Sequence, residues 1–91
     1  MHIKKDNNHN VIENLFRACG WVTIDTSTCH GVLLDFIAYK RRNEEIQLFF
    51  VEVKNGNKPL TPNEIVFIRL HSEYSLILKS EKQAREWLGI K

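Results

Sequence analysis

The sequence predicts a single α/β domain whose central β-sheet is mixed and is flanked by helices. The chain has 91 residues, enough for one compact domain spanning residues 1–91. Segments with helical spacing of apolar residues alternate with short apolar runs that are typical of strands. A short polar turn joins two of the strands, so they should be antiparallel, whereas a helix lies before the last strand and predicts a parallel pairing there.

The composition is that of an ordinary soluble domain. Hydrophobic residues make up 43% and charged residues 26% of the chain, and the net charge is +2. This charge is too small to indicate a nucleic-acid partner by itself. No apolar run is long enough for a signal peptide or a membrane span, and Cys19 and Cys29 lack the spacing of a zinc site. We expect reduced thiols and a cytoplasmic location without a membrane partner.

The N-terminal half predicts one helix and two strands. Residues 1–7 are polar and should be flexible. A helix should start at Asn8 or Asn10 and stop before Gly20, because its apolar residues recur at helical spacing. Residues 21–26 alternate as a half-buried strand does, and residues 32–39 form a second apolar strand interrupted by one acid, Asp35.

The polar segment 40–45 predicts a hairpin between residues 32–39 and the strand that begins at Leu48. If its turn is centred between Asn43 and Glu44, Tyr39 faces Leu48 and Ile37 faces Phe50. Asp35 then faces Glu52, with Cβ atoms about 5 Å apart. The isolated acids of two apolar strands would therefore be neighbours.

The C-terminal half predicts a helix, a strand and a last helix. After a loop rich in turn formers, Thr61 is the expected N-cap of a helix that reaches about His71, with Glu64 completing a capping box. A strand follows over residues 74–79. Ser80 and Gln83 form a second capping-box pattern, and Gly89 should end the last helix.

The charged residues around the third strand suggest a metal site. Glu52 and Lys54 are two residues apart and should leave the same face of the strand, which is costly unless they are paired, hydrated or bound. Asp35 and Glu52 together suit a hard cation such as Mg²⁺, and Lys54 could stabilise a developing oxyanion. A structural ion-pair cluster of Asp35, Glu52 and Lys54 is an alternative interpretation.

These residues resemble the motif of the PD-(D/E)XK nuclease superfamily. The matching segments are residues 31–35 around Asp35, residues 50–54 (Phe-Val-Glu-Val-Lys), and residues 60–64, and the likeness covers roughly residues 8–80. VRR-NUC domains and Holliday junction resolvases are the nearest members. The resemblance implies a restriction-endonuclease-like αβββαβ core with a mixed central sheet, here with an extra C-terminal helix.

The resemblance also implies roles for individual residues. Asp35 and Glu52 would bind Mg²⁺ or Mn²⁺ together with the backbone carbonyl of Val53, and Lys54 would be the catalytic lysine. The family tends to place a further acid on the first helix, for which Glu13 is the candidate, although that acid usually lies about one turn earlier. A solvated helix-face glutamate is the alternative for Glu13.

The chain departs from the family pattern at two positions. Leu34 replaces the usual proline before the first acid, and Glu64 stands where relatives often have glutamine. A carboxylate at Glu64 could bind metal, but it would repel phosphate, and helix capping is sufficient to explain it.

The resemblance implies DNA as the substrate, in branched, flap or junction form, cut by a homodimer with two active sites. The alternative is an inactive nuclease fold that serves as a DNA-binding or assembly module. Small domains of this type resemble phage or mobile-element proteins. Lys40, Arg41 and Arg42 are interpreted as a solvated hairpin tip, with phosphate contact to distal DNA as the alternative. The candidate substrate-binding residues are His30, Lys58, Glu64, Lys4, Lys5 and Arg69.

Overall fold

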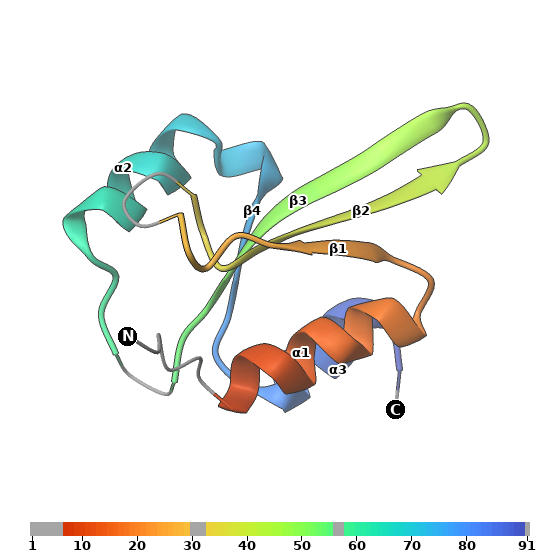
Figure 1. Cartoon of the computed structure of the whole chain (residues 1–91), viewed down its shortest axis with the longest axis horizontal. Coiled ribbons are helices and arrows are strands. Elements are labelled where there is room, and N and C mark those ends of the chain that lie inside the picture. Colours follow the sequence, from red (N-terminus) through yellow and green to blue (C-terminus); the bar gives the residue numbers. More distant parts are fainter. Residues whose placement is uncertain (1–6, 30–32, 56–57, 91) are drawn as a thin grey trace.

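The computed structural model describes residues 7–29, 33–55 and 58–90 (Figure 1). Its regular elements run in the order helix, three strands, helix, strand, helix, with a short 3₁₀ turn before the last strand. They are α1 (Asn7–Ala18), β1 (Val22–Asp25), β2 (Phe36–Arg42), β3 (Glu45–Val53), α2 (Pro62–Leu70), η1 (Ser72–Tyr74), β4 (Ser75–Leu78) and α3 (Glu81–Leu88).

The four strands form one mixed sheet in the order β1-β2-β3-β4. β1 and β2 pair antiparallel, as do β2 and β3, while β3 and β4 are parallel across the α2 connection. The predicted mixed α/β architecture is therefore confirmed. The parallel pair follows from the crossover, since a helix between two strands lets the chain return to the same end of the sheet.

Helices cover the two faces of the sheet unequally. α1 and α3 lie side by side against one face (Figure 1), where Phe16 meets Phe36 with ring centroids 5.4 Å apart and Trp87 meets Phe49 at 5.0 Å. α2 packs on the other face through Phe67, whose ring centroid is 5.0 Å from that of Phe50. The fully buried side chains accordingly lie on the α1 and α3 side: Ile12, Phe16, Phe36, Ala38, Val51 and Ala84.

The predicted hairpin register is confirmed, but the predicted strand ends are not. Tyr39 pairs with Leu48 and Ile37 pairs with Phe50. The turn is tighter than expected, because β2 continues to Arg42, β3 starts at Glu45, and Asn43 takes a positive φ of 57° between them. Asn tolerates this left-handed backbone, so two residues are enough to reverse the chain.

The prediction that a strand begins at Val32 lies partly outside the described residues and is wrong for Leu33 to Asp35. These residues precede β2, which starts at Phe36. Thr26 explains the local course of the chain, since its hydroxyl donates to the Leu34 carbonyl at 2.6 Å and its N–H donates to the Asp35 carbonyl at 2.9 Å. These bonds hold the segment before Phe36 against the end of β1 without a regular ladder.

The helix ends follow their sequence signals with one difference. Thr61 and Glu64 form both bonds of the predicted capping box at the start of α2. At α3, the Ser80 hydroxyl accepts from the Gln83 N–H, but the Gln83 side chain accepts from the Lys79 N–H instead of the N-cap. Gly89 ends α3 at a φ of 78°, which costs glycine little. Both cysteines are free thiols.

No helix within the described ranges has the length and apolar character needed to cross a membrane.

Candidate metal centre and its surroundings

The end of β3 carries a buried carboxyl next to a lysine. Glu52 is 3% exposed, and Lys54 follows it on the face of the strand that α2 covers. The Lys54 ammonium lies 3.4 Å from Glu52 Oε2 and 2.8 Å from Glu64 Oε1. Glu64 comes from the first turn of α2, where the capping box orients its side chain. α2 therefore places a second carboxyl, that of Glu64, beside Glu52 and Lys54, the two residues expected from the sequence.

Asp35 lies beside this group, though not by the predicted ladder pairing with Glu52. The ladder ends at Phe36 and Val51, and the Asp35 N–H donates to the Val51 carbonyl at 2.9 Å. The Asp35 carboxylate instead accepts from the Val53 N–H at 2.7 Å. The backbone of Val53 is therefore in contact with the Asp35 carboxylate. The carbonyl of Val53 is the third metal ligand expected from the sequence.

The pKa shifts indicate that the cluster of Asp35, Glu52, Glu64 and Lys54 carries excess negative charge. Burial, a hydrogen bond with Glu64 and the charge of Asp35 together raise the pKa of Glu52 to about 9. Burial also raises the pKa of Asp35, although the Val53 N–H and the charge of His9 act in the opposite direction. Because Glu52 is buried and lies with two further carboxyl groups beside a single lysine, it holds its proton near neutral pH.

Glu64 and Lys54 keep their charges by pairing. Burial alone would raise the pKa of Glu64, but hydrogen bonds from Glu52, Lys54 and the Thr61 N–H lower it overall. Burial alone would lower the pKa of Lys54, but its hydrogen bond to Glu64 and the charge of Glu52 raise it overall. Glu64 is consequently both the helix cap expected from the sequence and a partner of the candidate catalytic lysine.

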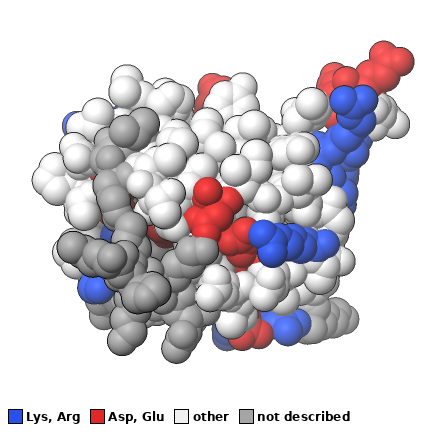
Figure 2. Space-filling model, in the orientation of Figure 1, with Lys and Arg blue, Asp and Glu red and all other residues white. Residues whose placement is uncertain are grey.

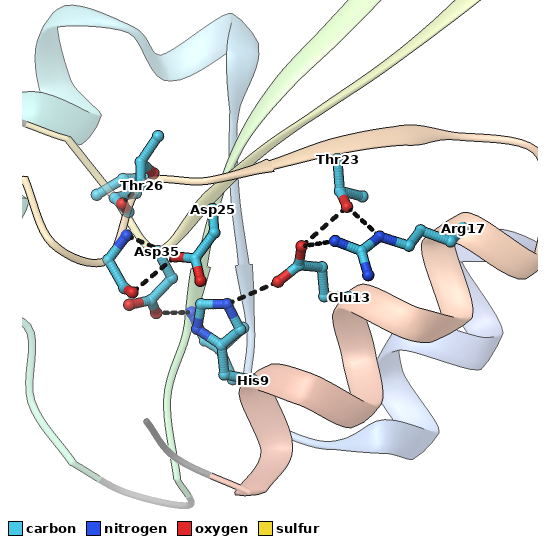
Figure 3. A network of polar contacts seen from close by, with 10 residues as sticks. His9, Glu13, Arg17, Thr23, Asp25, Thr26 and Asp35 are labelled. Carbon is cyan, nitrogen blue, oxygen red and sulfur yellow. Dashed lines mark hydrogen bonds and ion pairs between the residues drawn. The ribbon is translucent and has the colours of Figure 1, made fainter. Parts of the chain in front are cut away.

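On α1, His9 lies close enough to Asp35 to affect the pKa of its carboxyl. His9 is 2% exposed, its ring lies between Glu13 and Asp35 (Figure 3), and its charge lowers the pKa of Asp35. It stands one turn before Glu13, the position at which the family resemblance places an acid. A histidine one turn before a helix acid is the signal that could have identified it from the sequence.

Glu13 is buried, and both its oxygens have partners in the protein. Oε1 lies 2.9 Å from His9 Nε2, while Oε2 accepts from Arg17 at 2.6 Å and from the Thr23 hydroxyl at 2.9 Å (Figure 3). Glu13 thus holds the His9 ring in place and joins α1 to β1. Its predicted role as a metal ligand would require some of these bonds to be exchanged.

One group of side chains within the described ranges has the spacing of a cation site, and of its three members only Glu13 was expected from the sequence to bind metal. Ligand atoms of His9, Glu13 and Asp25 all lie within 4.8 Å of one another. Asp25 is exposed at the end of β1. Acidic side chains reach the surface between α1 and β1, with basic side chains beside them (Figure 2). His9 belongs to this group and also acts on Asp35, so the two sets of carboxyls are neighbours.

Only some of the candidate substrate-binding residues lie near this cluster in the described part of the chain. Lys58 is exposed just after the loop that follows β3, where its N–H donates to the Asn55 carbonyl at 3.2 Å. Asn55 also accepts from Asn8 at 2.6 Å, which ties the start of α1 to the same loop. Arg69 is exposed near the end of α2. Lys4, Lys5 and His30 lie outside the described residues.

The donor set fits a hard divalent cation. Asp35, Glu52 and the Val53 carbonyl offer oxygen atoms only, which is the chemistry that Mg²⁺ and Mn²⁺ prefer. A cation bound there would supply positive charge that the single lysine does not, and would favour the ionised form of Glu52, whose pKa is raised without it.

No protein-family model, curated protein or solved structure matches this chain.

Proposed function

We propose that this protein is a divalent-metal-dependent endonuclease that hydrolyses phosphodiester bonds in DNA, with a restriction-endonuclease-like core. One observation carries the proposal: the fold brings Asp35, Glu52 and Lys54 together at the end of β3, with the backbone of Val53 between them. The order of strands and the parallel β3–β4 pair agree with an αβββαβ core.

The residues divide the chemical work between binding and charge stabilisation. Asp35, Glu52 and the Val53 carbonyl would hold Mg²⁺ or Mn²⁺, which supplies a water of lowered pKa and offsets charge on the phosphate. Lys54 would orient the attacking water or stabilise the extra negative charge on the phosphoryl oxygens. The electrostatic interaction with His9 lowers the pKa of Asp35 and so favours its ionised form.

Lys54 has to exchange partners for this chemistry. In the structure its ammonium is bound to Glu64 at 2.8 Å. Phosphate bound at the site would compete for Lys54, and a cation would lower the negative charge that Glu52 and Glu64 share. We therefore assign Glu64 the role of holding Lys54 in the absence of substrate.

The proposal is tested with labelled DNA. A four-way junction, a flap and a plain duplex are incubated with the protein in Mg²⁺, in Mn²⁺ or in EDTA. Cleavage should need the metal and should favour the branched substrates, because a domain this small has few elements for reading bases. Lys54→Ala and Glu52→Ala should each reduce cleavage by at least about a hundredfold. Full activity in either variant would refute the proposal.

A homodimer would give the two active sites needed to cut both strands of a junction. The face of the sheet on which α2 packs supports this assembly, because it carries exposed apolar side chains. Val22, Ile24 and Ile46 lie on that face at 48%, 49% and 56% exposure, and α2 buries none of its residues although most are apolar. A helix that is apolar on most sides is usually covered. A second copy of the chain would cover this surface.

A DNA-binding or assembly module without catalysis is the second candidate. It is favoured by the ion pairs that occupy Lys54 and by the partners that engage both oxygens of Glu13. Calorimetric titration with Mn²⁺ distinguishes the two functions. A nuclease site should bind the ion and lose most of its affinity in Asp35→Asn, whereas a site that binds no metal favours the module.

A further inference from the structure

A pocket on the other side of the molecule contains both tryptophans of the chain. It has a volume of about 190 Å³ and is lined by Cys19, Trp21, Lys40, Arg42, Trp87 and Leu88. α3 supplies Trp87, the start of β1 is preceded by Trp21, and the outer part of β2 supplies the two basic residues. None of these residues belongs to the carboxyl cluster at the end of β3.

The aromatic wall of the pocket is held rigidly and still reaches solvent. Trp21 and Trp87 have ring centroids 5.7 Å apart, and Trp87 also packs edge-on against Phe49 at 5.0 Å. Trp87 nevertheless remains 38% exposed. The solvent-exposed part of a fixed indole can contact a planar ring at little cost in side-chain entropy.

The basic wall of the pocket has no acidic partner within 4 Å among the described residues. The Lys40 ammonium lies 5.9 Å from the centre of the Trp21 ring and donates to the Cys19 carbonyl at 3.0 Å. Among the described residues, no ion pair within 4 Å involves Lys40 or Arg42, although Glu45 faces Arg42 across the hairpin. Lys40 and Arg42 alternate onto the same face of β2, about 7 Å apart along the strand.

These properties select the chemistry of the ligand. A cationic ligand would be repelled by Lys40 and Arg42, and a neutral aromatic ring would leave both side chains without an anionic partner. The volume is below the roughly 300–1,000 Å³ of pockets that enclose a whole drug-sized molecule, so one ring fits. Two cations spaced along a strand suit consecutive negative groups. A base with its flanking phosphates combines these features.

We propose that this pocket binds an unpaired nucleotide of a DNA strand, with the base against Trp87 and the flanking phosphates at Lys40 and Arg42. The choice of a nucleic acid over another aromatic anion rests on the proposed function. The pocket would let the protein recognise the single-stranded part of a branched or flapped substrate by a surface that takes no part in cleavage.

The test uses the intrinsic fluorescence of the two tryptophans, which both line the pocket, in EDTA so that no cleavage occurs. Titration of the full chain with oligothymidylate should quench the fluorescence and saturate, whereas a duplex of equal length should quench far less. Trp87→Leu should weaken binding by roughly tenfold. Arg42→Gln should weaken binding of the oligonucleotide several-fold. It should also reduce the slope of log affinity against log salt concentration by about the amount that one phosphate contact contributes.

Arg41→Gln is the matched control, because Arg41 is the next residue along β2 and lies on the opposite face of the strand. It should leave the affinity nearly unchanged, and Glu45→Gln should raise it. Equal losses in Arg41→Gln and Arg42→Gln, or equal quenching by duplex, would overturn the pocket assignment. Arg42 is exposed, so its variant separates binding from folding if Trp87→Leu does not fold. Loss of junction cleavage in Lys54→Ala tests the nuclease independently of this result.

Discussion

At the scale of single residues, Glu64 is the residue that we propose to hold Lys54 in the absence of substrate. Its carboxylate binds Lys54 and raises the pKa of Glu52. Glu64→Gln keeps an oxygen for the Thr61 N–H, so the capping box can persist. We expect cleavage to rise several-fold and its pH optimum to fall, because Lys54 is released and Glu52 ionises more easily. Cleavage rates across pH provide the measurement, and a large loss of activity would instead identify Glu64 as a metal ligand.

Glu52 should make the protein less stable as pH rises when metal is absent. Its carboxyl has an ordinary pKa of 4.5, and the folded protein raises this to about 9. Between these values the folded chain keeps a proton that the unfolded chain has lost, so the free energy of unfolding falls with increasing pH. The stability that Glu52 contributes is fully present below the pKa of its carboxyl in the unfolded chain. It is lost as pH rises through the pKa of the same carboxyl in the folded protein.

Urea unfolding in EDTA measures this effect. The wild type should lose on the order of 3 kcal/mol between about pH 5 and about pH 7 through this group. Glu52→Gln is neutral in both states and should lose correspondingly less over the same range, although Asp35 continues to contribute. Parallel pH profiles for the two proteins would show that Glu52 is ionised in the fold.

The residues of the site differ in how far the sequence could predict them. Asp35, Glu52 and Lys54 can be selected from the sequence because each is a charge within or beside an apolar run, where a charge is costly unless it is paired or bound. The position of His9 one turn before Glu13 is visible in the sequence, but its burial depends on the tertiary contact of α1 with Phe36 and is not. The Lys54–Glu64 pair was also missed, since it depends on where the crossover helix places its first turn.

At the scale of elements, the cap of α2 connects helix stability to the site. Thr61→Ala should cost about 1 kcal/mol of unfolding free energy through the lost capping bond. It should also alter cleavage, because the same capping box orients Glu64 toward Lys54. Ser80→Ala is the control, since Ser80 caps α3 on the opposite face of the sheet. Its stability cost should be similar, with cleavage unchanged, as compared by urea unfolding and junction assays.

Element types were predictable from the sequence, whereas strand ends were not. The hairpin register followed from the position of the turn, and Asn43 with its positive φ explains why the turn stays centred there. The polar residues Lys40–Arg42 were expected to be turn, yet they continue β2, because cross-strand pairing with Glu45–Gln47 satisfies their backbone. The segment before Phe36 leaves the ladder for bonds to Thr26, which no periodicity indicates.

At the scale of the whole molecule, the open sheet face predicts the oligomeric state. The domain is small, so covering the face that carries Val22, Ile24 and Ile46 would add substantially to its stability. We expect a dimer in sedimentation equilibrium at micromolar concentration. Ile24→Asp combined with Ile46→Asp should give monomers, since two charges would be buried at the interface.

The control for this prediction is Val11→Asp. Val11 is 39% exposed on α1, which lies on the other face of the sheet, so the same chemical change there should leave the dimer intact. If the dimer is the active form, the double variant should also lose cutting of both strands in one encounter and release singly nicked junctions. A monomeric wild type would instead mean that this apolar face has another partner or remains open, and that each cut is made separately.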